Sequence, residues 1–306
     1  MTTTPTRVTR TSPVSRVDDD VATRLLESSR LLSFDPMTEV DWDAPLDPTL
    51  YGLSPEWSTL YGTPLWDTMS EEQRVTLTRH EMSSIMSTGI WFEMILQQMV
   101  LRDLYATDPG RAEFQFGLTE IADECRHSIM FARAMEKMGI AAYYPTRTAI
   151  ELARGYKTLA TGESAYGGVL VAEEVLDIMQ RDLMRDDRIL PIIKDTSRIH
   201  VVEESRHMTF AREEMKASLV GVGTLRRHHS ALLISIVASV IVGNLVNKDV
   251  YAAAGLDPAR AIEAARTNAH HASMMRSSSA HLMEFLGETG LLTGPARRIY
   301  QRLHML

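Results

Sequence analysis

The feature that most constrains this chain is a four-residue segment that occurs twice. Glu124–His127, with the sequence Glu-Cys-Arg-His, recurs 80 residues later as Glu204–His207, with the sequence Glu-Ser-Arg-His. A further glutamate lies 31 residues before the glutamate of each tetrad, at Glu93 and at Glu173. The sequence therefore indicates two halves, each with a lone glutamate on one helix and a Glu-x-x-His pair on the next.

The spacing of a Glu-x-x-His pair directs its carboxylate and imidazole to one point. On an α-helix, residues three apart lie about 60° apart around the axis and about 4.5 Å along it. Two such helices, antiparallel to two helices with one glutamate each, surround a site in the manner of ferritin-like di-iron or di-manganese four-helix bundles. Four converging glutamates are costly to bury without cations, and oxygen-rich ligation with imidazole suits iron or manganese.

The alternative interpretation of these residues is a set of solvated acids and surface histidines, but two copies at matched distances are not expected by chance. His200 precedes Glu204 by four residues and His207 by seven, so the three share one helix face. The alternative for His200 is a bystander in the core or on the surface. We predict seven metal ligands: Glu93, Glu124, His127, Glu173, His200, Glu204 and His207.

Helix signals without alternating strand patterns predict an all-α fold. The spacing of Ser70 and Gln73 predicts a capping box, and Pro109, Pro191 and Pro258 suit first helical positions. The expected long helices span about 70–105, 109–138, 163–185, 191–217, 224–254 and 258–287, with a short last helix after Gly294. The first four form the metal-binding core at about 70–217, and the remaining helices extend it.

The N-terminal region is predicted to add a tail and a wrapping segment. Residues 1–16 are expected to be a disordered tail, and residues 17–306 a single domain. Asp18–Leu32 fits a short amphipathic helix. Phe34–Thr68 contains five prolines interleaved with aromatic residues, which predicts a segment packed over the core without a direct role in chemistry.

Composition excludes several function classes. The net charge of −8, without a basic stripe, argues against nucleic-acid binding. The single cysteine and the absence of an apolar export signal fit a cytoplasmic protein. The apolar run Ala231–Val246 is shorter than the roughly 20 residues of a membrane span. We expect it to be a buried central helix or part of a homodimer interface, and we expect no membrane association.

The motifs resemble those of known di-iron proteins. Asp123–His127 is similar to the signature of bacterial multicomponent monooxygenases, ribonucleotide reductase small subunits and acyl-carrier-protein desaturases. With His200 added, the order is Glu, Glu-x-x-His, Glu, then His-x3-Glu-x-x-His. That order resembles the p-aminobenzoate N-oxygenase family of di-iron arylamine oxygenases over roughly residues 70–220, and it implies that the same seven residues are ligands.

The resemblance implies an O2-dependent oxygenase with two iron ions, or manganese in their place. Such an enzyme would oxidise an amine nitrogen, that of an arylamine, to hydroxylamine, nitroso or nitro products in a biosynthetic pathway. No flavin or nicotinamide motif is visible, so electrons are expected from an external reductase, a small reductant or peroxide. The alternatives are a di-iron hydroxylase or desaturase acting on a C–H bond of an apolar or carrier-bound substrate, and a non-enzymatic ferroxidase or metal-binding protein.

Four charged neighbours of the ligands are expected to support the cluster, with no catalytic residue beyond it. Asp123 and Glu203 precede the two tetrads and are predicted to hydrogen-bond the ring N–H of a ligand histidine in the opposite half. Arg126 and Arg206 lie inside the tetrads and are expected beside the same ligands. These arginines are more typical of the other di-iron families.

Overall fold

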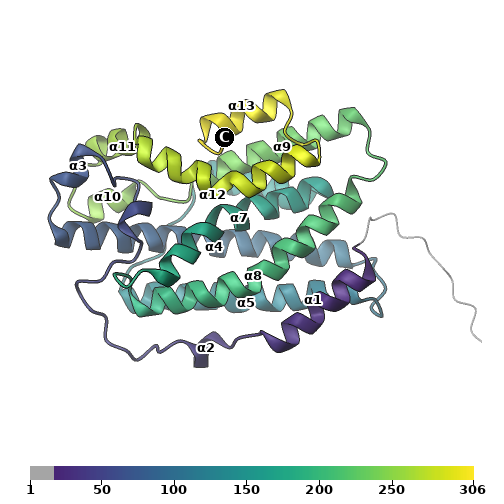
Figure 1. Ribbon diagram of the computed structural model, residues 1–306, viewed down its shortest axis with the longest axis horizontal. Coiled ribbons are helices and arrows are strands. Elements are labelled where there is room, and N and C mark those ends of the chain that lie inside the picture. The colour runs from purple at the N-terminus through teal and green to yellow at the C-terminus, as the bar shows by residue number, and fades with distance from the viewer. Residues whose placement is uncertain (1–16) are drawn as a thin grey trace, which may run out of the picture.

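The protein is helical throughout the part that the structure describes. The structure is a computed structural model, and it describes residues 17–306 (Figure 1). The only strand-type pairing within those residues is an isolated bridge between Tyr51 and Ile189. The all-α prediction is confirmed. The predicted tail at residues 1–16 lies outside the described residues.

Four long helices form the centre of the molecule: α4 (Glu71–Leu104), α5 (Ala112–Met138), α7 (Glu163–Arg185) and α8 (Pro191–Ser218). Helix α4 packs against α5 and α7 against α8, and contacts of α5 with α8 and of α4 with α7 close the bundle. Short connections join α4 to α5 and α7 to α8, so each pair is a helical hairpin. The ferritin-like four-helix bundle is confirmed, and each hairpin carries one half of the repeat.

The ends of these helices follow local chemistry. The capping box of α4 is present. The backbone N–H of Gln73 donates to Ser70 Oγ at 3.2 Å, and the backbone N–H of Ser70 donates to Gln73 Oε1 at 3.1 Å. The predicted start of the second helix at Pro109 is wrong. The Asp108 carboxylate accepts a hydrogen bond from the Gly110 amide at 2.9 Å, which closes a turn, and α5 begins only after Arg111.

The N-terminal region wraps around the bundle, starting on one side of it and ending against C-terminal residues such as Tyr251. Helix α1 (Asp19–Leu31) packs on α5 and α8. The following chain runs along the bundle in Figure 1 through three short helices, α2 (Pro36–Glu39), η1 (Pro55–Trp57) and α3 (Pro64–Asp67). Its tryptophans are buried, and the indole N–H of Trp57 donates to Asp182 of α7 at 3.0 Å. The aromatic side chains therefore anchor this segment to the core, as expected.

The C-terminal helices lie on the opposite side of the bundle (Figure 1): α9 (Thr224–Val242), α10 (Asp249–Ala253), α11 (Pro258–Arg266), α12 (Ala269–Glu288) and α13 (Gly294–Arg302). The two continuous helices predicted at 224–254 and 258–287 are therefore each divided in two. At the second break, the Asn268 side chain caps α12 by accepting from the His270 amide at 3.0 Å. The same side chain donates to the Tyr61 carbonyl at 2.9 Å, which ties the break to the wrapping segment.

Helix α9 differs from the predicted buried central helix. One face packs on α7 and α13, while Leu232 and Ile236 on another face are 38% and 41% exposed. Within residues 17–306, α9 alone has the length and apolar composition that would allow a membrane crossing, and core helices of soluble proteins share those properties. Helix α6 (Arg147–Leu159), which lies between the two hairpins in sequence and packs on α4, was not predicted.

Candidate metal centre

The four bundle helices bring all seven predicted ligands to one buried place. They are Glu93 on α4; Glu124 and His127 on α5; Glu173 on α7; and His200, Glu204 and His207 on α8. Three groups among them have potential ligand atoms within 4.8 Å of one another. The groups are Glu93, His127 and His200; Glu124, Glu204 and His207; and Glu173, His200 and Glu204.

Two glutamates lie between the two Glu-x-x-His imidazoles. His127 Nδ1 is 3.2 Å from Glu124 Oε2 and 3.3 Å from Glu204 Oε1. His207 Nδ1 is 3.1 Å from Glu124 Oε1 and 3.1 Å from Glu204 Oε1. Each carboxylate therefore faces a histidine of its own hairpin and a histidine of the other. This position suits a carboxylate that bridges two cations.

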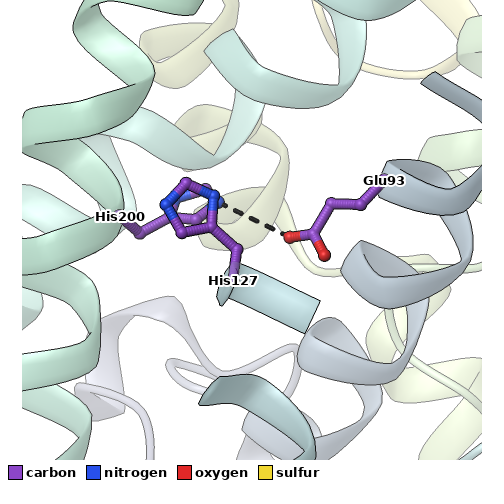
Figure 2. A group of neighbouring side chains, drawn as sticks. All are labelled: Glu93, His127 and His200. Carbon is purple, nitrogen blue, oxygen red and sulfur yellow. Dashed lines mark ion pairs between the residues drawn. The ribbon is translucent and has the colours of Figure 1, made fainter. Parts of the chain in front are cut away.

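His200 faces the same centre through Nε2, whereas His127 and His207 face it through Nδ1. Its Nε2 is 3.7 Å from Glu204 Oε1 and 3.9 Å from Glu93 Oε1, and Figure 2 shows the Glu93 carboxylate pointing toward the imidazoles of His127 and His200. Gln180 Oε1 lies 2.8 Å from His200 Nδ1. An amide oxygen only accepts hydrogen bonds, so Nδ1 carries the proton and Nε2 presents its lone pair to the centre. Burial lowers the pKa of His200 to about 4, which keeps the ring neutral and able to bind metal.

The acids that precede the tetrads contact histidines of the opposite hairpin. Glu203 Oε2 accepts from His127 Nε2 at 2.8 Å, and Asp123 Oδ2 accepts from His207 Nε2 at 3.2 Å. Each acid thus binds Nε2, the outer nitrogen, of a ring whose Nδ1 faces the centre. Such an acceptor fixes the tautomer and the orientation of a metal-binding imidazole.

The two arginines neutralise part of this outer layer of acids. Arg126 forms an ion pair with Asp123. The Arg206 guanidinium is buried, and its Nη2 lies 3.8 Å from Asp123 and 3.9 Å from Glu203. A guanidinium is a cation without an acceptor atom, so neither arginine is itself a metal ligand. Both are therefore placed to support the acids that hold the histidines.

Burial and crowding shift the ionisation of the inner residues strongly. Burial, reinforced by neighbouring carboxylates, raises the pKa of Glu93 and of Glu173 well above the usual range. Burial also acts on Glu204, but the charge of His207 and hydrogen bonds from two histidines hold its pKa well below that range. Despite burial, hydrogen bonds and charges from surrounding carboxylates raise the pKa values of His127 and His207. The centre therefore needs positive charge, which protons or metal cations can supply.

Two buried carboxylate oxygens without hydrogen-bond partners among the described residues indicate that metal ions fit this site. Glu93 Oε1 and Glu204 Oε2 are buried and accept no hydrogen bond from any of residues 17–306. A buried carboxylate oxygen without a partner is costly, and a cation would satisfy it. Four carboxylates and three imidazoles form a donor set that suits two iron or manganese ions. The residues present therefore fit a dinuclear metal centre.

Sequence reasoning missed three polar residues around the centre. Ser128 donates a hydrogen bond to Glu93 Oε2, and Gln180 orients His200. Glu120, one helical turn before Glu124, is fully buried, and burial raises its pKa to about 8. The repeat contained the signal for Glu120, because it lies 80 residues before His200. The first half thus carries an acid where the second carries its extra histidine.

A small cavity reaches the ligands from the side of α4 and α9. This inner cavity has a volume of about 30 Å³ and is lined by Glu93, Glu173 and His200 together with apolar side chains that include Phe131. The inner cavity therefore leaves a small space open directly beside the ligands.

Comparisons with known proteins agree with the helical fold. The family model described as p-aminobenzoate N-oxygenase AurF matches residues 15–290. An uncharacterized protein of Mycobacterium tuberculosis is 27% identical over 219 residues, which cover 68% of this chain and 63% of that protein. An uncharacterized protein of Mycobacterium bovis is 27% identical over 214 residues, which cover 66% and 62% respectively. The matched region thus spans less than two thirds of the length of these relatives.

Proposed function

The chain belongs to the p-aminobenzoate N-oxygenase AurF family, and from this premise we propose that it is an oxygenase that uses O2 to oxidise an amine nitrogen. The family itself indicates a di-iron oxygenase. The observation that carries the proposal is the buried donor set of four glutamates and three histidines drawn from four helices. That set, with an accessible cavity beside it, supports oxygen chemistry on a small organic group.

The seven residues of the donor set would together hold the two metal ions: Glu93, Glu124, His127, Glu173, His200, Glu204 and His207. Glu124 and Glu204 are the most central of them, because each faces both Glu-x-x-His imidazoles. When bound, two iron ions supply the electron transfer that activates O2. The chain's own residues fix this donor set and exclude bulk water from it.

The proposed reaction balances with an external electron donor. One oxygen atom of O2 forms the N–O bond of a hydroxylamine, and the other leaves as water. The donor supplies one electron pair, and solvent supplies two protons. An arylamine is the substrate class that we propose for this step, with further oxidation leading to nitroso and nitro products.

Isotope labelling of the product tests this proposal. The iron-loaded protein is supplied with a reductant, 18O2 and an aniline, and the products are analysed by mass spectrometry. We expect an aryl hydroxylamine that carries 18O on nitrogen, and no such product from a Glu124→Ala variant. Formation of ring- or chain-hydroxylated amines alone would favour the C–H hydroxylase. Oxygen consumption without any organic product would favour a ferroxidase.

A further inference from the structure

A second and much larger cavity lies next to the inner one. This outer cavity has a volume of about 730 Å³ and lies between α4, α6, the first turn of α7 and α9. Pockets for drug-sized ligands usually measure about 300–1,000 Å³. The outer cavity therefore has far more room than a single aromatic ring requires.

The outer cavity leads toward the metal ligands. Thr88 and Phe92 of α4 and Ile241 of α9 line both cavities. The inner cavity, on the other side of these residues, is lined by Glu93 and His200. At about 30 Å³ the inner cavity is far smaller than the outer cavity of about 730 Å³, so it suits a reacting amino group better than a ring or chain. The rest of such a molecule would have to lie in the outer cavity.

Among residues 17–306, no lysine or arginine that lines the outer cavity is left unpaired, and His229 is the one other basic side chain in its wall. Of its charged side chains, Arg226 donates to both oxygens of Glu163 at 2.7 and 2.8 Å, and Glu151 pairs with Arg154 at 2.8 Å. Apolar side chains such as Leu233 and Val237 of α9 cover most of the remaining wall. Apolar area gains free energy on leaving water, whereas an unpaired carboxylate would lose it.

We propose that the outer cavity binds the body of the substrate, and that the substrate is an amine with a long apolar body, such as an alkyl-substituted arylamine. The assignment rests on the proposed function for the identity of the reacting nitrogen. It separates this chain's substrate from a small aminobenzoate, whose carboxylate would meet no unpaired lysine or arginine among the described residues that line the outer cavity. The wall formed by α6 and α9 selects the substrate by its apolar length.

Binding to the iron-loaded protein without oxygen tests the proposal apart from turnover. Dissociation constants are measured by calorimetry for aniline, 4-butylaniline, 4-octylaniline and 4-aminobenzoate. We expect the dissociation constant to fall about fourfold for each added methylene until the outer cavity is filled. We expect 4-aminobenzoate to bind no better than aniline.

Two substitutions fill the outer cavity from opposite walls. Val237→Trp on α9 and Ala153→Trp on α6 each place an indole in it. We expect each to weaken 4-octylaniline binding at least tenfold, and an iron content equal to that of wild type reports a folded centre. Leu232→Trp is the matched control, because Leu232 lies on the same helix, is 38% exposed and does not line the cavity.

The outcomes separate the two proposals. A dissociation constant independent of chain length, or tightest binding of 4-aminobenzoate, would overturn the assignment of the outer cavity. So would a change of oligomeric state in Val237→Trp with unaltered 4-octylaniline binding, because a second copy of the chain would then cover this surface. Length-dependent binding without any N-oxygenated product would support the cavity assignment and contradict the proposed function.

Discussion

Every histidine in the metal centre has its outer ring nitrogen held by a residue from another helix. The pairs are His127 with Glu203, His207 with Asp123, and His200 with Gln180. A held nitrogen leaves only the other nitrogen to face the centre, so the partner determines both tautomer and rotation of the ring. We therefore expect these partners to raise the affinity for metal, although none of them belongs to the donor set.

Removal of one partner should weaken metal retention. In Asp123→Ala, the His207 ring loses its acceptor, and we expect the iron affinity to fall 10- to 100-fold. The affinity is measured by competition with a chelator, with a circular dichroism melt to check folding. Glu213→Gln is the control, because Glu213 lies on the same bundle helix as His207 and, within residues 17–306, pairs with the exposed Lys216 alone. Equal iron affinity in wild type and Asp123→Ala would contradict this role.

A buried glutamate away from the centre makes stability depend on pH. Burial raises the pKa of Glu81 from 4.5 to about 7, although Oε1 accepts from the Thr59 amide at 2.9 Å. Between these pH values the folded state binds more protons than the unfolded state, so the free energy of unfolding falls as pH rises.

Glu81→Gln should remove that dependence. Relative to wild type, we expect the variant to gain roughly 2 to 3 kcal/mol of stability between pH 5 and pH 8. Urea unfolding of both proteins at the two pH values measures the difference. A constant difference in unfolding free energy across this range would show that Glu81 does not titrate there.

The ligand positions were predictable because they depend on local helical geometry. Glu-x-x-His places two groups on one helix face whatever surrounds it, and the repeat supplied the second copy. Gln180 was not predictable, because its contact with His200 depends on how α7 packs on α8, which no spacing within one helix reveals. Glu120 lies 80 residues before His200, so the repeat places the two at equivalent positions. The residue types differ, however, and a search for identical residues does not find the pair.

At the scale of elements, tertiary contacts explain where prediction failed. The apolar pattern continues past Val242, yet α9 ends there. Ser84 Oγ of α4 donates to the Leu245 carbonyl at 3.0 Å and accepts from the Asn247 amide at 2.8 Å, and Thr88 Oγ1 donates to the Asn244 carbonyl at 2.7 Å. These hydroxyls satisfy backbone groups that a continued helix would satisfy internally. A partner on another helix cannot be inferred from the sequence of α9 alone.

The wrapping segment depends on one close approach to α4. A Cβ at Gly52 would lie 2.6 Å from the Arg79 Cα, a backbone atom that cannot move aside cheaply. Arg79 also donates to the Leu50 carbonyl at 3.0 Å, so the two elements are held at this distance. Any residue larger than glycine at position 52 would therefore push the wrapping segment away from α4.

Two glycine substitutions should have opposite effects. We expect Gly52→Ala to lower the free energy of unfolding by about 1 to 3 kcal/mol through overpacking. Gly155→Ala lies inside α6 with nothing within 4 Å of the added methyl, and should raise stability by up to about 1 kcal/mol through helix propensity. Urea unfolding compares the two with wild type. Wild-type stability in Gly52→Ala would contradict the close packing.

At the scale of the molecule, half of the acid surplus and the repeat have one explanation. The chain carries a net charge of −8, and two divalent cations would offset the charge of the four central glutamates. The two hairpins exchange partners across the centre, because Glu203 of one holds His127 of the other and Asp123 holds His207. Metal binding should therefore join the hairpins and stabilise the folded state by mass action.

The iron content of the purified chain tests the central claim most directly. The protein is loaded anaerobically with ferrous iron, freed of unbound metal by gel filtration, and assayed for iron per chain. We predict two iron ions per wild-type chain, and none tightly bound in a Glu124→Ala/Glu204→Ala double variant that remains helical by circular dichroism. A wild-type chain without bound iron, or a double variant that retains both ions, would contradict the assignment of this centre.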